Sequence, residues 1–152
     1  MDRRGDDVAG AMGRRGALAA LLGAAACAVA CKHVAEDRCQ YCGMTIAPNS
    51  AWTAELTTAD GVVHRFDAPK CALLAWRKGR VAATSSRFQE FYERAWRDGA
   101  ELRFALGSDV VAPMGGDAVP VAPERAAKFA SDHVAARVVS LGELTTDVLE
   151  AL

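Results

Sequence analysis

The sequence has no long run of charge of either sign, and this absence narrows the partners that the protein can bind. The whole chain holds 18 Lys and Arg and 19 Asp and Glu. The first 30 residues hold four of the basic and three of the acidic side chains, so the remainder carries 14 against 16, a net charge near −2. Nucleic-acid-binding domains and basic membrane-binding faces concentrate positive charge. The sequence therefore predicts no nucleic-acid partner and no membrane contact through charged side chains.

The sequence also lacks a hydrophobic run long enough to span a bilayer comfortably. Its N-terminal apolar segment, residues 17–30, contains no charge, follows Arg14 and Arg15, and is followed at once by polar sequence. A short apolar run of this kind after basic residues is typical of a signal peptide. Residues 1–30 are therefore interpreted as a signal peptide of the lipoprotein type and excluded from the fold.

The end of this segment indicates lipidation at Cys31. Small residues precede this cysteine, as in a bacterial lipoprotein cleavage site, although Cys27 also follows small residues and a secretory signal without lipid is an alternative. Acyl chains such as palmitate on Cys31 would hold the protein at a membrane surface without a transmembrane helix, with residues 31–38 as the lipidated N-terminus and a short linker. The prediction is a lipid-anchored protein of the cell envelope, facing the periplasm or another extracytoplasmic space.

Three cysteines follow Cys31, namely Cys39, Cys42 and Cys71. An odd number allows one disulfide at most and leaves a free thiol, which an exported protein tends to lose to oxidation unless the thiol is protected. Metal binding would provide that protection. Whether Cys39 and Cys42 form a disulfide in the resting protein stays open at this point.

The densest group of soft ligands lies in residues 38–44, which hold Cys39, Cys42 and Met44, with Gly43 able to bend the backbone sharply. Thiolate and thioether ligands favour Cu(I), whereas a structural zinc site uses four thiolate or imidazole ligands and no methionine. The motif therefore predicts a Cu(I) site. The alternative is a disulfide or redox pair at Cys39 and Cys42, with Met44 in the core.

The chain after Cys31 has 121 residues, enough for one modest core, so we expect one folded unit. Apolar periodicity and turn residues predict its elements. These are a hairpin of strands 52–57 and 62–66, helix 68–78, helix 86–97, strand 101–106, a turn at 107–109, loop 112–116, strand 117–121, helix 123–133, strand 136–140 and helix 141–152. The two halves follow a similar order, which suggests a diverged duplication.

Three further side chains are candidate ligands. His64 falls on the second strand of the hairpin among apolar neighbours, Cys71 in the first turn of the helix that Pro69 opens, and Met114 in the glycine-rich loop. A helix N-terminus favours a thiolate, and a methionine in a Gly-rich loop is unlike a core residue. Each has an ordinary alternative: a packed histidine, a small buried cysteine, and a methionine folded under its loop.

Several of these motifs follow one another in a recognisable order. They are Cys39, Cys42 and Met44 in residues 39–44, Phe-Asp-Ala-Pro-Lys-Cys and a Leu-Leu-Ala-Trp run in residues 66–76, Pro-Met-Gly in residues 113–115, and Ala-Lys-Phe-Ala in residues 127–130. Behind an exported, lipoprotein-like leader, this set resembles the NosL family of bacterial lipoproteins over nearly the whole mature chain. The segment 86–97 departs from the family, because it is helix-like where a strand-like segment with Asp and Trp is expected.

The resemblance implies a small α+β domain of paired ββα-like units, here residues 39–152, that binds Cu(I) as a copper chaperone. The client would be nitrous oxide reductase, whose copper centres are assembled outside the cytoplasm, or another assembly factor. The family's copper motif falls on Cys42 and Met44, and its other recurring motifs contain Cys71 and Met114. The implied activity is binding and transfer rather than catalysis. Four side chains are candidates to complete a two- or three-coordinate Cu(I): Cys39, Cys71, Met114 and His64.

Two other classes of protein also fit parts of the sequence. A thiol-disulfide oxidoreductase would use Cys39 and Cys42, but the thioredoxin-like strand-helix-strand setting of such a pair is absent from the predicted elements. A small structural zinc domain would take its ligands from four side chains of acceptable type: Cys39, Cys42, Cys71 and His64.

Overall fold

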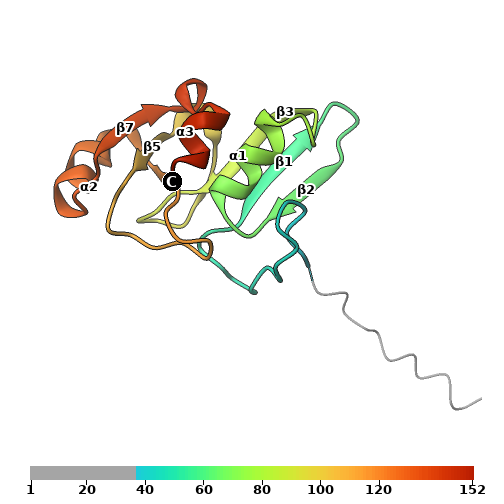
Figure 1. Ribbon diagram of the computed structural model, residues 1–152, viewed down its shortest axis with the longest axis horizontal. Helices are drawn as coiled ribbons and strands as arrows, with labels where there is room; N and C mark the ends of the chain where they lie inside the picture. The colour runs from blue at the N-terminus through green and yellow to red at the C-terminus, as the bar shows by residue number, and fades with distance from the viewer. Residues whose placement is uncertain (1–36) are drawn as a thin grey trace, which may run out of the picture. The chain divides into compact units, whose positions relative to one another are not determined.

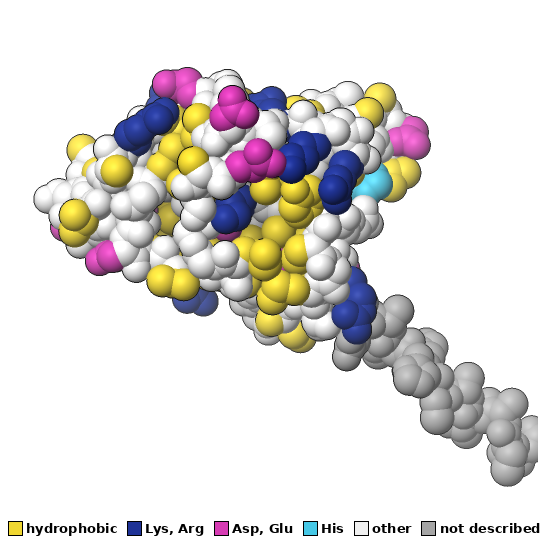
Figure 2. Space-filling view, in the orientation of Figure 1, with side chains coloured by type: hydrophobic (Ala, Val, Ile, Leu, Met, Phe, Trp, Pro, Cys, Tyr) yellow, Lys and Arg dark blue, Asp and Glu magenta, His cyan; other side chains and the backbone are white. Residues whose placement is uncertain are grey.

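The computed structural model describes residues 37–152. The expected signal peptide and the lipidation at Cys31 therefore lie outside the described residues. Within the described part of the chain, no helix is both long and apolar enough to cross a membrane. The elements form two antiparallel sheets with a few short helices (Figure 1). Side chains of both charge signs occur on the face shown in Figure 2.

The elements confirm the prediction of a small α+β domain. The strands are β1 Ala54–Thr58, β2 Val63–Phe66, β3 Ala83–Gln89, β4 Trp96–Asp98, β5 Arg103–Leu106, β6 Val119–Val121 and β7 Arg137–Ser140. The α-helices are α1 Pro69–Arg77, α2 Ala126–Asp132 and α3 Thr146–Glu150, and 3-10 turns cover Gly99–Glu101, Pro123–Arg125 and Leu141–Glu143. The diverged duplication stays a hypothesis.

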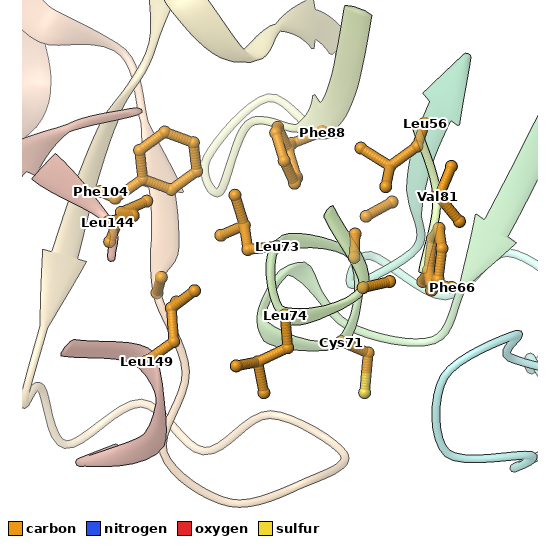
Figure 3. Packing of buried hydrophobic residues seen from close by; sticks show 14 of the residues in the cluster. Leu56, Phe66, Cys71, Leu73, Leu74, Val81, Phe88, Phe104, Leu144 and Leu149 are labelled. Atoms are coloured by element: carbon orange, nitrogen blue, oxygen red, sulfur yellow. The ribbon is translucent and has the colours of Figure 1, made fainter. Parts of the chain in front are cut away.

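The first sheet has the strand order β2-β1-β3-β4 and is covered by α1. The predicted hairpin is present: β1 pairs with β2, and Gly61 takes the left-handed backbone conformation, with φ +84°, that the tight turn requires. Helix α1 begins at Pro69, whose fixed φ suits a first helical position. In Figure 3, Leu73 and Leu74 of α1 lie among the buried side chains, while the sulfur of Cys71 points to the rim of this core.

The second sheet has the order β6-β5-β7 and is covered by α2, whose Phe129 is fully buried. The two sheets share a core. Phe88 of β3 and Phe104 of β5 meet edge to face, with ring centroids 5.3 Å apart. Edge-to-face pairs add to the stabilisation from burial alone, so this contact fixes one sheet against the other.

The helix predicted for residues 86–97 is wrong, because β3 and β4 form a hairpin there. Phe88, Phe91 and Tyr92 recur at helical spacing only by coincidence. Along β3, Ser86 and Phe88 point inward while their neighbours are more exposed, which is the period of a strand. Phe91 and Tyr92 instead pack against Phe129 in the second, smaller apolar cluster. The hairpin brings the chain closer to the strand-like segment expected for the family.

The single helix predicted for residues 141–152 is also not continuous. A 3-10 turn occupies Leu141–Glu143, and α3 begins only after Thr145. The Thr145 side chain accepts a hydrogen bond from the backbone N–H of Val148. A threonine side chain satisfies one of the unpaired amides at a helix start, so it favours a new helix there over continuation of the turn.

Candidate metal site

Three thiols and one carboxyl group lie together beside the N-terminus of α1. The ligand atoms of Cys39, Cys42, Asp67 and Cys71 all lie within 4.8 Å of one another. Cys39 and Cys71 expose 2% of their surface and Asp67 exposes 4%, while Cys42 is half-buried. All three cysteines are free thiols. The cluster is therefore buried on one side and reaches solvent through Cys42.

The turn that carries Cys39 and Cys42 is held by its own backbone. The N–H of Cys39 donates to the carbonyl of Met44 at 2.8 Å, and the N–H of Gly43 donates to the carbonyl of Cys39 at 2.9 Å. Gly43 has a φ of +80°, a conformation that costs a residue with a Cβ. Arg38 adds a hydrogen bond from Nη1 to the Gly43 carbonyl. This tight turn places both sulfurs on one side.

The same turn lies against strand β2. The N–H of Gln40 donates to the carbonyl of Arg65 at 3.3 Å, and the Gln40 side chain hydrogen-bonds the Nδ1 of His64. Directly after β2, the chain passes through Asp67 into α1, where Cys71 is the third residue. The connection between β2 and α1 therefore brings Asp67 and Cys71 up to the Cys39–Cys42 turn.

The thiols influence one another's protonation. A hydrogen bond from Cys71 lowers the pKa of Cys39 to about 6, although burial acts against this shift. The same hydrogen bond, together with burial, raises the pKa of Cys71. Burial raises the pKa of Cys42, whose sulfur lies 3.6 Å from each carboxylate oxygen of Asp67. The cluster thus favours the thiolate at Cys39 over the other two sulfurs, and metal binding displaces the protons that the thiols still hold.

The structure brings together three of the six predicted metal ligands, namely Cys39, Cys42 and Cys71. Met44 and Met114 expose 42% of their surface, so neither is a core residue. His64 lies outside the cluster, and its hydrogen bond to Gln40 supports the turn instead. Its expected apolar surroundings are also incomplete, because Val62 is 49% exposed.

Asp67 is the residue that the sequence analysis missed. Helix α1 begins at Pro69, with Ala68 at the N-cap position and no side-chain cap, and the Cys42 sulfur lies 3.6 Å from the Asp67 carboxylate. A carboxyl group four residues before Cys71, at the junction of a strand and a helix, was the available signal. Only the tertiary packing places it opposite Cys42.

The Met114 loop is fastened to the first turn of α1. Asp117 accepts a hydrogen bond from the Lys70 backbone N–H at 2.8 Å, and Lys70 Nζ donates to the carbonyl of Gly116 at 3.0 Å. Lys70 directly precedes Cys71. These contacts hold a loop that is distant in sequence close to the thiol cluster.

Asp117 makes stability depend on pH. Burial raises its pKa to about 7, because one carboxylate oxygen is buried without a partner. The backbone hydrogen bonds from Lys70 and Ala118 to the other oxygen act in the opposite direction and only partly offset the effect of burial. The folded state therefore binds a proton that the unfolded state, with a pKa near 3.9, has already released. Stabilisation from this proton is complete below about pH 4 and is lost as the pH rises through about 7.

We expect Asp117→Asn to remove this loss, because the amide stays neutral at every pH. Denaturant unfolding of the metal-free, reduced protein at several pH values between acid and neutral measures it. The stability of the wild type should fall relative to that of Asp117→Asn as the pH rises across this range. Parallel curves for the two proteins would contradict the assignment.

Three thiols with a carboxylate suit a thiophilic ion. Thiolates bind both Cu(I) and Zn(II), and Cu(I) also accepts thioether sulfur and low coordination numbers. A Cys₃Asp set satisfies tetrahedral zinc as well. Within residues 37–152, the adjacent exposed thioether of Met44 is the feature that distinguishes this site from a closed zinc site.

The chain is similar to known proteins both in sequence and in fold. The model of the NosL family matches residues 30–149. The copper chaperone NosL from Shewanella denitrificans has a similar crystal structure, with a TM-score of 0.63 and 16% identity, covering 72% of this chain and 90% of that one. At this identity the likeness concerns the fold. A comparison with curated protein sequences gives no match.

Proposed function

Because the chain belongs to the NosL family, as its sequence predicts, we propose that it is a copper chaperone that binds Cu(I) and passes it to a partner protein. One observation carries the proposal: the sulfurs of Cys39, Cys42 and Cys71 lie with the Asp67 carboxylate within 4.8 Å of one another, with one thiol open to solvent. This arrangement holds a soft ion and leaves it within reach of an incoming ligand.

The buried and exposed thiols have different tasks in this proposal. Cys39 and Cys71, both 2% exposed, form the fixed side of the site. Cys42 closes it from the solvent side, where its sulfur lies 3.6 Å from each carboxylate oxygen of Asp67. A recipient sulfur then enters from the exposed side before the last buried thiolate lets go, as in other sulfur-exchange reactions. The metal passes by ligand exchange, without redox chemistry or catalysis.

Met44 and Met114 serve as outer ligands in this scheme. Met44 lies two residues from Cys42, and Met114 is on the loop that Lys70 and Asp117 fasten beside Cys71. Both thioethers are exposed, so they can meet an ion on its way in or out. His64 is no longer needed as a ligand, because its ring holds Gln40 in place.

We also infer a cellular location and a copper recipient. We propose that Cys31 carries the lipid anchor, that the domain faces the periplasm or an equivalent space, and that the copper serves nitrous oxide reductase. Cys31→Ser in the full chain should then leave a folded domain that fractionates away from membranes. If this variant still sediments with membranes, the anchor is elsewhere in the chain.

Metal competition tests the central proposal. The reduced protein, from residue 32 onward, is offered Cu(I) and Zn(II) together, and the bound metal is counted after gel filtration. We expect one Cu(I) per chain in preference to zinc, because the site combines thiolates with an accessible thioether. The zinc alternative, with Asp67 in place of His64, predicts bound zinc whose removal unfolds the domain. The oxidoreductase alternative predicts thiol-disulfide exchange without metal.

A further inference from the structure

Three cations lie on or against the segments that build the sulfur site. The guanidinium group of Arg80 lies over the ring of Tyr41, between Cys39 and Cys42, 4.6 Å from its centroid. Lys70 Nζ reaches the Gly116 carbonyl on the Met114 loop. Arg38 Nη1 reaches the Gly43 carbonyl of the cysteine turn. We call these three side chains, Arg38, Lys70 and Arg80, the basic rim.

Neither Lys70 nor Arg80 forms an ion pair with a carboxylate among residues 37–152. Lys70 Nζ donates to a carbonyl and its charge acts on the buried Asp117, and Arg80 lies over an aromatic ring. Two exposed acidic side chains have other cations as partners. Asp37 pairs with Arg65, and Glu150 pairs with Lys78. The chain as a whole carries a net charge of −1, so the rim is a local feature and not the result of a generally basic protein.

Two exposed thioethers lie on the segments that Arg38 and Lys70 contact, Met44 beside the cysteine turn and Met114 on the loop that reaches Lys70. Met44 and Met114 are both 42% exposed, whereas most large apolar side chains of the domain are buried. Figure 2 shows a hydrophobic area on the viewed face with Lys and Arg side chains, and also acidic side chains, beside it. An apolar centre within a charged border is the usual composition of a protein-protein interface.

We propose that this sulfur-bearing surface and its basic rim dock a copper-receiving protein whose own copper ligand is surrounded by Asp and Glu. The inference rests on the proposed function, because it names the kind of recipient that the site fits. Opposite charges at the two rims would steer the encounter and set the orientation in which sulfur meets sulfur. A lipid surface is a poorer match, because phospholipid headgroups contain no group that binds the two exposed thioethers.

The test measures Cu(I) transfer from the loaded full chain, kept in detergent, to synthetic acceptor peptides. The peptides share one Cys-x-x-Cys unit and differ in their flanks, which are acidic in one and basic in the other. At low ionic strength we expect transfer to the acidic peptide to be faster by roughly a factor of ten, and the difference to vanish at high salt.

Charge variants assign the effect to the rim. The double variant Lys70→Gln with Arg80→Gln should lose the preference for the acidic peptide, while Lys70→Arg with Arg80→Lys should keep it. Lys128→Gln is the matched control, since Lys128 is an exposed cation on α2, which packs on the other sheet. Equal rates for both peptides at low salt, or an unchanged preference in the Gln double variant, would overturn the proposal.

Two further measurements separate the possible failures. The Cu(I) affinity of each variant is determined first by competition with a chromophoric chelator. If the wild type does not bind Cu(I), the proposed function itself fails. If it binds Cu(I) with no charge preference in transfer, only the docking inference fails. Anionic lipid vesicles and free acidic peptide are also compared as inhibitors of the transfer. If the vesicles inhibit as strongly as the peptide, the basic rim binds a membrane, and the proposal of a protein partner is overturned.

Discussion

Cys42→Ser is expected to lower the Cu(I) affinity of the reduced protein by more than about two orders of magnitude while leaving the fold intact. Changes to groups that merely support a ligand already cost roughly 10- to 100-fold in metal affinity, so the loss of a ligand should exceed that range. Cys42 is half-buried at the edge of the cluster, and serine keeps its shape, so the stability of the metal-free protein should change little. Competition with a chromophoric Cu(I) chelator, alongside denaturant unfolding, measures both quantities.

Methionine variants provide the matched comparison. Met44→Leu and Met114→Leu keep volume and apolarity and remove only the thioether, so each should weaken Cu(I) binding less than Cys42→Ser does. If both thioethers act on one ion, their effects should be non-additive in the double variant, whereas separate sites add to within about 0.3–0.5 kcal/mol. Unchanged Cu(I) affinity in Cys42→Ser would remove this cysteine from the site and leave Cys39 and Cys71 as the primary pair.

Phe88→Ala is expected to destabilise the metal-free domain by about 3–5 kcal/mol, because it leaves a cavity at the junction of the two sheets. Phe88 is fully buried and meets Phe104 edge to face. Since small domains are stable by only about 5–15 kcal/mol, the variant should be close to unfolding at 37 °C. Urea unfolding at 15 °C, monitored by tryptophan fluorescence, measures the change.

Added copper should partly rescue this variant. An ion that binds only the folded state raises apparent stability by mass action, and Phe88 contributes no group to the thiol cluster. The melting temperature of Phe88→Ala should therefore rise with Cu(I), while the variant Phe88→Ala with Cys42→Ser should respond far less. If Phe88→Ala lowers the free energy of unfolding of the metal-free domain by less than about 1 kcal/mol, below the range for large-to-small changes, the two sheets do not depend on this contact.

Much of the fold could be predicted wherever local signals agree with the tertiary structure. Gly61 marks the turn of the β1–β2 hairpin and Pro69 the start of α1, and both act through backbone geometry that needs no distant partner. The helices predicted for residues 86–97 and 141–152 are wrong because their local signals disagree with the tertiary structure. Around Phe88, an accidental helical spacing of aromatics competed with a strand whose inward residues include Ser86, a polar residue that hides the alternation.

The type of ligand in the candidate site could be predicted from the sequence, but the full set of residues that form the site could not. Soft sulfur ligands are visible in the sequence at Cys39, Cys42 and Cys71, so the class of metal follows from chemistry alone. Asp67 enters the site, and His64 leaves it, through contacts between segments more than twenty residues apart. Periodicity along one strand cannot report such contacts, because it places a side chain on a face without saying what lies opposite.

The sequence separation between Cys39 and Cys71 determines whether the protein can keep a bound ion when it unfolds. An ion held by both would close a chain loop containing the whole β1–β2 hairpin. In a denatured ensemble such closure costs roughly 3–4 kcal/mol of chain entropy, so an unfolded chain retains at most the local Cys39–Cys42 pair. Unfolding therefore releases the bound ion. A protease that cleaves unfolded chains encounters mainly metal-free ones. Under the proposed function, degradation of this protein would therefore remove metal-free chains and leave the copper with its recipient.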